Sequence, residues 1–187
     1  MLGYNSDFNW MNYNRVTKTK SGSNIDNTSN LIYGTEYGEA PSNGNDVIVA
    51  GSGNDRIYAN GGNDVIAGGA GNDTMNGGWG NDTFFFEKGS GNDTISDFGH
   101  SASGNLDQIV VEGTYLGSSS SFLGTTLKFD FDGDTKADAS VLLLGVSASS
   151  WKTYMKEGAL VDASTAAGAV QVQQVHDLVH HDYLLPA

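Results

Sequence analysis

The sequence predicts an all-β fold in which short strands are stacked through glycine-rich turns. The triplet Gly-Asn-Asp recurs through residues 44–93, and its aspartates are spaced by nine residues four times and then by eleven. An apolar side chain follows two residues after each of these aspartates. The chain has 26 glycines but only 2 prolines, whereas disordered low-complexity chains are usually rich in proline. A fixed short period is typical of solenoids, whose repeats bury a core only when they stack.

The composition excludes several classes of function. With 187 residues, the chain has room for one domain or for a repeat array with a partner module. Its net charge of -13 repels nucleic acid and anionic lipid and attracts cations. The absence of cysteine rules out disulfides and thiolate metal sites. No apolar stretch is long enough to span a membrane, and residues 1–14 do not resemble a cleavable signal peptide.

Each repeat unit reads as a six-residue turn followed by a three-residue strand. The aspartates of the triplets are Asp46, Asp55, Asp64, Asp73, Asp82 and Asp93. The apolar positions behind them are Ile48, Ile57, Ile66, Met75, Phe84 and Ile95. A flexible linker would not need this register, so the phase that the six copies share favours stacked turns.

Stacking also predicts cation sites. If successive strands alternate between two sheets, Asp46, Asp64 and Asp82 form one column, and the other three triplet aspartates form a second. Neighbouring carboxylates in a column would lie about 4.8 Å apart, which is unfavourable unless a cation lies between them. Ca²⁺ takes six to eight oxygen ligands from carboxylates and backbone carbonyls. Two columns give about four sites or more, enough to neutralise about eight of the thirteen excess negative charges.

Residues 41–96 resemble the RTX family of calcium-binding nonapeptide repeats, with the pattern G-G-x-G-x-D-x-U-x. The resemblance implies a right-handed parallel β-roll with Ca²⁺ between turns, held by the six triplet aspartates and by turn carbonyls. The glycines that it implicates are Gly44, Gly53, Gly62, Gly69, Gly71, Gly78 and Gly80. The copies at 41–46 and 59–64 lack the leading glycine pair, and two extra residues precede the last copy.

The segments DTISDF (93–98) and LDQIVV (106–111) resemble the part that closes the roll in secreted metalloproteases and alginate epimerases. The resemblance implies that Asp97 and Asp107 complete the last ion sites, although exposed aspartates at strand ends remain the alternative.

Further along, the alternation of apolar residues in 127–146 predicts a hairpin that faces the core. Its tip carries Asp130, Asp132, Asp134 and Asp138. Thr135 and Val141 stand where an EF-hand loop needs glycine and glutamate. A plain turn is therefore favoured over a further calcium site, and the second reading stays open.

Three other features receive structural interpretations. HDLVH (176–180) resembles the zinc-protease motif H-E-x-x-H, but Asp177 replaces the glutamate, which favours a helical tail with two surface histidines. The aromatic residues Tyr4, Phe8, Trp10 and Tyr13 are expected to cap the open end of the roll, with sugar stacking as the alternative. The asparagines of the triplets are interpreted as turn formers that tolerate a left-handed backbone.

Together these features predict a secreted, non-catalytic, calcium-binding β-roll that folds on binding Ca²⁺ outside the cell. The expected parts are an N-terminal cap (1–33), the repeats (34–96), a β-rich capping region with a hairpin (97–162) and a C-terminal tail with a secretion signal (163–187). The RTX resemblance implies export by type I secretion machinery and an extracellular or cell-surface location. Two alternatives remain, namely an accessory module of a larger protease or polysaccharide epimerase that contacts polysaccharide, and a self-associating surface, matrix or adhesin protein.

Overall fold

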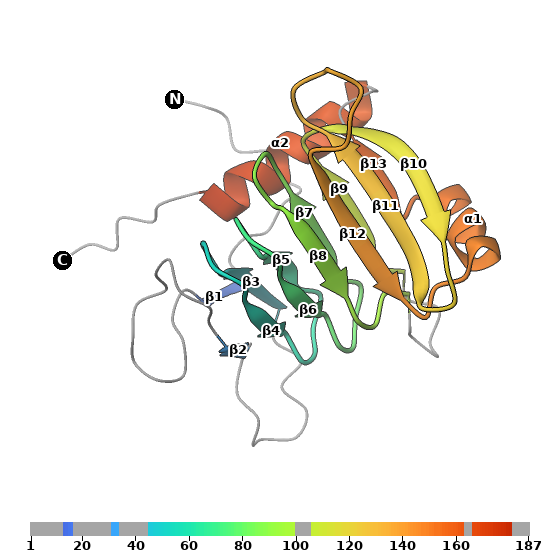
Figure 1. The fold of residues 1–187 in the computed structure, drawn as a ribbon. Coiled ribbons are helices and arrows are strands. Elements are labelled where there is room, and N and C mark those ends of the chain that lie inside the picture. Colours follow the sequence, from blue (N-terminus) through green and yellow to red (C-terminus); the bar gives the residue numbers. More distant parts are fainter. Residues whose placement is uncertain (1–12, 17–30, 34–44, 100–105, 163–165, 181–187) are drawn as a thin grey trace.

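Two β-sheets lie face to face and enclose the core of the molecule (Figure 1). The computed structural model describes residues 13–16, 31–33, 45–99, 106–162 and 166–180. The first sheet contains, in spatial order, β1 (Tyr13–Val16), β3 (Asn45–Val49), β5 (Val65–Ala67), β7 (Thr83–Phe86), β9 (Gln108–Val111) and β13 (Leu160–Asp162). All neighbouring strands in this sheet are parallel.

The second sheet combines parallel and antiparallel pairs. Its order is β2 (Leu31–Tyr33), β4 (Arg56–Tyr58), β6 (Thr74–Asn76), β8 (Asn92–Ile95), β12 (Ala139–Leu144), β11 (Gly124–Asp130) and β10 (Thr114–Ser120). The pairs from β2 to β12 are parallel, and the pairs β12–β11 and β11–β10 are antiparallel. Successive repeat strands alternate between the two sheets, which confirms the predicted parallel β-roll.

The core is a column of apolar side chains, one from each repeat strand. The six predicted positions, from Ile48 to Ile95, are at most 1 % exposed and belong to one buried cluster. Leu127, Phe129, Val141 and Leu143 extend this cluster into the β11–β12 hairpin, which confirms the predicted inward alternation. A three-residue strand contributes only one such side chain, so the repeats bury apolar surface only as a stack.

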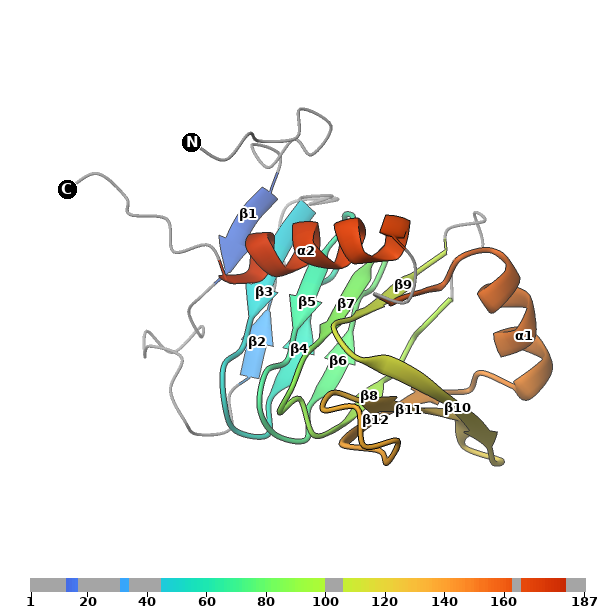
Figure 2. The ribbon, with the colours of Figure 1, turned by 90° about the horizontal axis from the view of Figure 1, so that it is seen from above.

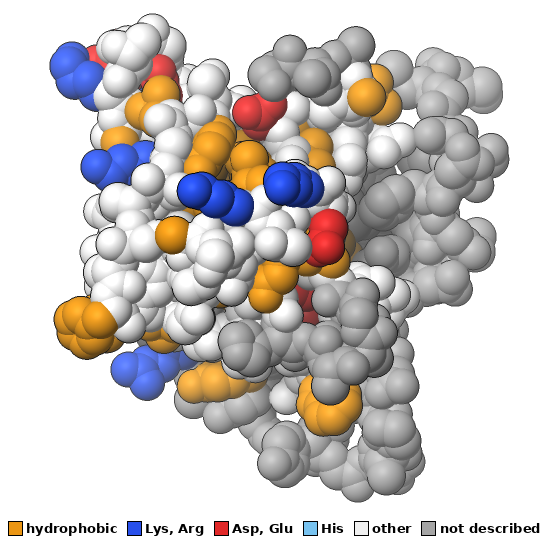
Figure 3. Space-filling view, turned by 90° about the vertical axis from the view of Figure 1, so that its right-hand side faces the viewer, with side chains coloured by type: hydrophobic (Ala, Val, Ile, Leu, Met, Phe, Trp, Pro, Cys, Tyr) orange, Lys and Arg blue, Asp and Glu red, His pale blue; other side chains and the backbone are white. Residues whose placement is uncertain are grey.

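Helix α1 (Ala148–Lys156) closes the end of the roll beside the hairpins. Its N-cap residue, Ser147, accepts a hydrogen bond from the Ser150 backbone N–H, which satisfies a donor in the first turn. Trp151 is buried against Phe98 and donates from Nε1 to the Tyr115 hydroxyl, 3.2 Å away. Figure 3 shows that hydrophobic side chains on this side of the molecule form small separate groups among polar atoms.

Helix α2 (Ala166–His180) lies across the outer face of the first sheet (Figure 2). It buries Val172, Val175 and Val179 in a second apolar cluster. The sheet residues of that cluster are Val47, Val65, Ala67, Phe85 and Val110. The helical part of the predicted tail is thus packed on the roll. Among the described residues, neither helix has the length and apolar character needed to cross a membrane.

The structure describes only residues 13–16 and 31–33 of the predicted N-terminal cap. Strands β1 and β2 pair in parallel with β3 and β4 and so extend both sheets by one strand. Tyr4, Phe8 and Trp10, which are expected to cap the roll, lie outside the described residues.

The turns of the roll stack so closely that some glycines have no room for a side chain. A Cβ atom at Gly80, whose φ is 143°, would lie 1.7 Å from the Gly62 carbonyl oxygen of the neighbouring turn. Gly133, in the β11–β12 turn, also has a positive φ, of 82°, but a Cβ there would meet nothing within 4 Å.

We therefore expect Gly80→Ala to destabilise the calcium-loaded fold more than Gly133→Ala does. Both substitutions place alanine in a left-handed conformation, which costs about 1–2 kcal/mol. Only the first adds a clash with the backbone, and overpacking of this kind typically costs a further 1–3 kcal/mol. Chemical denaturation in excess Ca²⁺ measures the difference. Equal free energies of unfolding in the two variants would contradict the close stacking.

Candidate metal centre

The predicted aspartates form two buried columns. In the first, the Oδ1 atoms of Asp64, Asp82 and Asp107 each accept a hydrogen bond from the backbone N–H of the aspartate one turn earlier, at 2.7, 2.9 and 3.0 Å. In the second, Asp73 accepts from the Asp55 N–H and Asp93 from the Asp73 N–H, both at 2.8 Å. The six triplet aspartates are 0–4 % exposed. The structure therefore arranges them as the alternation of strands predicts.

Asp97 and Asp107 lie at the end of the first column. Asp97 accepts hydrogen bonds from the backbone N–H groups of Gly77 (3.1 Å) and Gly78 (2.7 Å). Asp107 bonds to Asp82 through Oδ1 and accepts from the Gly99 N–H through Oδ2, at 2.8 Å. Both side chains thus contact the turns of the roll rather than extend into solvent. A cavity of about 360 Å³ opens beside Asp82 and Asp107.

The predicted glycines line the same turns. Gly71 and Gly80 each lie against a glycine one turn earlier, because a Cβ on either would meet the carbonyl oxygen of Gly53 or Gly62 at 1.7 Å. Gly69 lies in the same way against the Gly51 carbonyl, and Gly78 against that of Asn60. Gly44 lies outside the described residues.

Asn60 explains how the copy at 59–64 tolerates the loss of a leading glycine. Its φ is 78°, and asparagine adopts this left-handed conformation more readily than most residues. The Asn60 carbonyl accepts from the Trp79 N–H at 2.8 Å, as the Gly51 carbonyl accepts from the Ala70 N–H in the other stack of turns.

The asparagines of the triplets have a different role from the one predicted. Within the described residues, Asn60 and Thr135 are the non-glycine residues with positive φ, so the prediction of left-handed triplet asparagines is wrong. Instead, their side-chain Oδ1 atoms accept backbone N–H groups from the next turn. Asn45 accepts from Asn63 at 2.7 Å, and Asn63 accepts from Asn81 at 2.9 Å. A parallel ladder links Asn54 to Asn72 and Asn72 to Asn92.

Sequence reasoning missed these asparagine ladders, although their signal was present in the shared nine-residue period. They run in the opposite sense to the aspartate ladders, since each asparagine side chain reaches toward the C-terminal turn. The described turns that these ladders join are thus linked by side-chain hydrogen bonds in both directions.

Burial perturbs the titration of the column aspartates. It raises the pKa of Asp64 from 3.8 to about 8, and the charges of Asp82 and Asp46 add to the effect. Burial likewise raises the pKa of Asp82 to about 7, with contributions from Asp107 and Asp97. The pKa values of Asp73 and Asp93 rise to about 6 and 8 for the same reasons. Accepted backbone hydrogen bonds offset these shifts only in part.

The columns have the chemistry that a hard cation requires. The Oδ2 atoms of Asp64, Asp73 and Asp82 are buried and make no hydrogen bond. Those of Asp73 and Asp82 fold back into their own turns, where a Cβ on Gly68 or Gly77 would meet them at 2.3 Å. A bound cation would compensate these buried negative oxygens, and carboxylate with carbonyl oxygen is the donor set that Ca²⁺ prefers. The residues therefore fit calcium, and ligation by each of them remains a prediction.

The hairpin tip forms a tight turn stabilised by carboxylates. Asp130 accepts backbone N–H groups from Asp132, Gly133 and Thr135 at 2.7–3.1 Å. These backbone hydrogen bonds outweigh desolvation and lower the pKa of Asp130. The expected plain turn accounts for this geometry, because Asp side chains commonly bond to the backbone of their own turn.

A comparison with protein families supports the calcium assignment. Residues 42–75, 50–84 and 58–95 match the model of the RTX calcium-binding nonapeptide repeat (4 copies). No curated protein matches the chain. The chain is similar to the AlgE6R3 subunit of the Azotobacter vinelandii mannuronan C5-epimerase, known from its solution structure. The two share 26 % sequence identity over 81 % of this chain and 89 % of that chain, with a TM-score of 0.49.

We expect Asp64→Ala to remove more bound calcium than Asp46→Ala. Asp64 bonds to the turns on both sides of it, through its Oδ1 and its backbone N–H. Its carboxylate would therefore serve two ions, whereas Asp46 stands one turn farther from the middle of the column. The expected losses are about two ions and about one, measured as stoichiometry by calorimetric titration. Equal losses would contradict the shared-ion arrangement.

Calcium-free protein should gain β-structure on acidification. The raised pKa values mean that folding favours the neutral carboxyl groups of Asp64, Asp73 and Asp82. Their contribution to stability is complete below their unfolded pKa and is lost as the pH rises through about 6–8. Circular dichroism in resin-treated, calcium-free buffer at about pH 5 and about pH 8.5 tests this. Spectra that do not differ would contradict the prediction.

Proposed function

We propose that the chain, whose residues 42–95 match the model of the RTX calcium-binding nonapeptide repeat, is a secreted, non-catalytic β-roll module that folds when it binds Ca²⁺ outside the cell. The observation that carries the proposal is the pair of buried carboxylate columns. Asp64 illustrates it, because its side chain is 1 % exposed and lies between two other aspartates of its column.

Electrostatic repulsion opposes folding in the absence of calcium. Two unit charges 4 Å apart interact by about 4 kcal/mol at an effective dielectric constant of 20. Burial and then the charges of Asp82 and Asp46 raise the pKa of Asp64, and burial and then the charge of Asp73 raise the pKa of Asp93. The buried apolar cluster that opposes this repulsion takes only one or two side chains from each strand. The balance therefore favours an unfolded chain when calcium is scarce.

Calcium reverses this balance by mass action. An ion that binds only the folded chain stabilises it by about 2.7 kcal/mol when its concentration is 100 times its dissociation constant. With about four sites that share ligands, this stabilisation accumulates along the roll, and folding becomes cooperative with ion binding.

The same dependence suits export through type I secretion machinery. An unfolded chain can pass a narrow conduit, and the calcium-rich exterior then supplies the ions for folding. Helix α2 lies in the segment 163–187, in which we place the secretion signal. Because α2 packs on the first sheet, this segment would become covered only after the roll has formed, when recognition is complete.

Circular dichroism of the full chain with EGTA and then with Ca²⁺ tests the proposal. We expect a largely unfolded spectrum in EGTA at about pH 8 and a β-rich spectrum in millimolar Ca²⁺. Mg²⁺ at the same concentration is the control, because it requires smaller octahedral sites and gives up water reluctantly. A chain already β-structured in EGTA would refute calcium-driven folding.

A further inference from the structure

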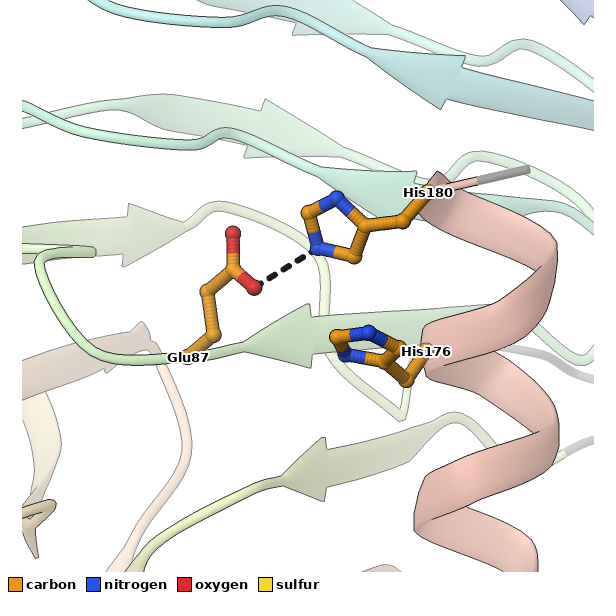
Figure 4. A group of neighbouring side chains, drawn as sticks. All are labelled: Glu87, His176 and His180. Atoms are coloured by element: carbon orange, nitrogen blue, oxygen red, sulfur yellow. Dashed lines mark hydrogen bonds and ion pairs between the residues drawn. The ribbon is translucent and has the colours of Figure 1, made fainter. Parts of the chain in front are cut away.

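Two histidines and a glutamate meet where helix α2 ends above strand β7 (Figure 4). Glu87 follows β7 directly, and His176 and His180 lie one turn apart on α2. The Nε2 atom of His180 is 2.7 Å from Oε2 of Glu87. Each of the three side chains offers one ligand atom, and these atoms all lie within 4.8 Å of one another. Residues 93 positions apart in sequence thus form one compact polar group.

Packing against the first sheet holds the two histidines in place. The two imidazole rings are 4.5 Å apart between centroids. Both rings contact the buried Phe85 edge-on, at 6.3 and 6.4 Å. Val175 and Val179, which flank the histidines on α2, are buried against the first sheet. Packing of the helix therefore fixes the positions of both histidines.

A second carboxylate increases the negative charge of the group. Glu112, which follows β9, lies 2.5 Å from Nδ1 of His176 through its Oε1. The side chains of His176 and His180 are 35 % and 43 % exposed, and those of Glu112 and Glu87 are 30 % and 29 % exposed. The group is therefore accessible to an ion from solvent, unlike the aspartate columns.

The donor set selects a class of metal. Two imidazole nitrogens with a carboxylate oxygen suit Zn²⁺ and similar transition-metal ions. Ca²⁺ instead prefers an all-oxygen shell. Zn²⁺ binds such ligands at about 2.0–2.2 Å, so its ligand atoms lie about 3.3 Å apart in a tetrahedron.

We propose that Glu87, His176 and His180 bind a transition-metal dication of the Zn²⁺ class, separate from the calcium columns. The ion links the last turns of α2 to the end of β7 and so fastens the helix to the roll. Glu112, beside His176, adds a further negative charge that favours the cation.

Asp177 provides a matched control. It occupies the position of the glutamate in the motif H-E-x-x-H, but in the structure it is exposed and accepts a hydrogen bond from Gln173 at 2.7 Å. The carboxylate that contacts His180 is Glu87, which directly follows β7. A site of the proposed geometry therefore depends on Glu87 and not on Asp177.

The test titrates the full chain, saturated with Ca²⁺, with Zn²⁺ by calorimetry and with Co²⁺ by visible absorption. We expect one ion per chain at this site, with ligand-field bands from Co²⁺ that indicate nitrogen and oxygen ligands. His176→Ala/His180→Ala should abolish this binding, and Glu87→Gln should weaken it by more than about 10-fold. Asp177→Asn should bind as the unchanged chain does. Calcium-dependent circular dichroism verifies that each variant folds.

Several results would overturn the proposal. Absence of Zn²⁺ binding in the unchanged chain would show that the four side chains form only histidine–glutamate ion pairs. Binding that survives the double histidine substitution would place the ion elsewhere, for instance in the calcium columns. If Asp177→Asn and Glu87→Gln lost affinity for Zn²⁺ equally, the result would show that Glu87 is not a ligand of the ion.

Discussion

The fold depends on a hydrogen bond that joins the side chain of one aspartate to the backbone of another. The Oδ1 atoms of five aspartates each accept the N–H of the aspartate one turn earlier, as Asp64 does from Asp46. This contact sets the register between turns, and it also draws buried carboxylates together in a column. The hydrogen bonds that align the strands therefore also create the repulsion between carboxylates, which a cation must relieve.

The glycines and asparagines make this contact feasible. Turns can approach closely only where no Cβ intervenes, as at Gly71 and Gly80. The asparagine ladders then hold the same turns from the opposite direction, as Asn45 does with Asn63. Very little of the stability resides within any single turn, since the hydrogen bonds of these ladders run between turns. The roll is therefore expected to fold cooperatively, because single repeats do not fold alone.

The period of the sequence was enough to predict stacked turns and inward positions such as Ile66, and it predicts the two columns once the strands are taken to alternate between two sheets. The RTX resemblance supplied the parallel β-roll. The family resemblance added Asp97 and Asp107, which contact the last turns of the first column. The asparagines were misjudged, since their residue type fits a left-handed turn equally well and composition does not reveal where a side chain points. The contact of Glu87 with His180 could not be predicted, because it depends on how α2 packs across the first sheet.

Because the strands alternate between two sheets, the fold depends on whether the number of repeat units is odd or even. Contacts between equivalent residues of the regular copies span 18 positions, two repeat units, because consecutive units belong to opposite sheets. Loss or gain of a single nine-residue unit would transfer every later strand to the other sheet, and the hairpins and α2 would then meet the wrong partners. Loss or gain of a pair would only shorten or lengthen the roll. Such an array can therefore gain or lose repeat units only in pairs if the hairpins and α2 are to keep their packing partners.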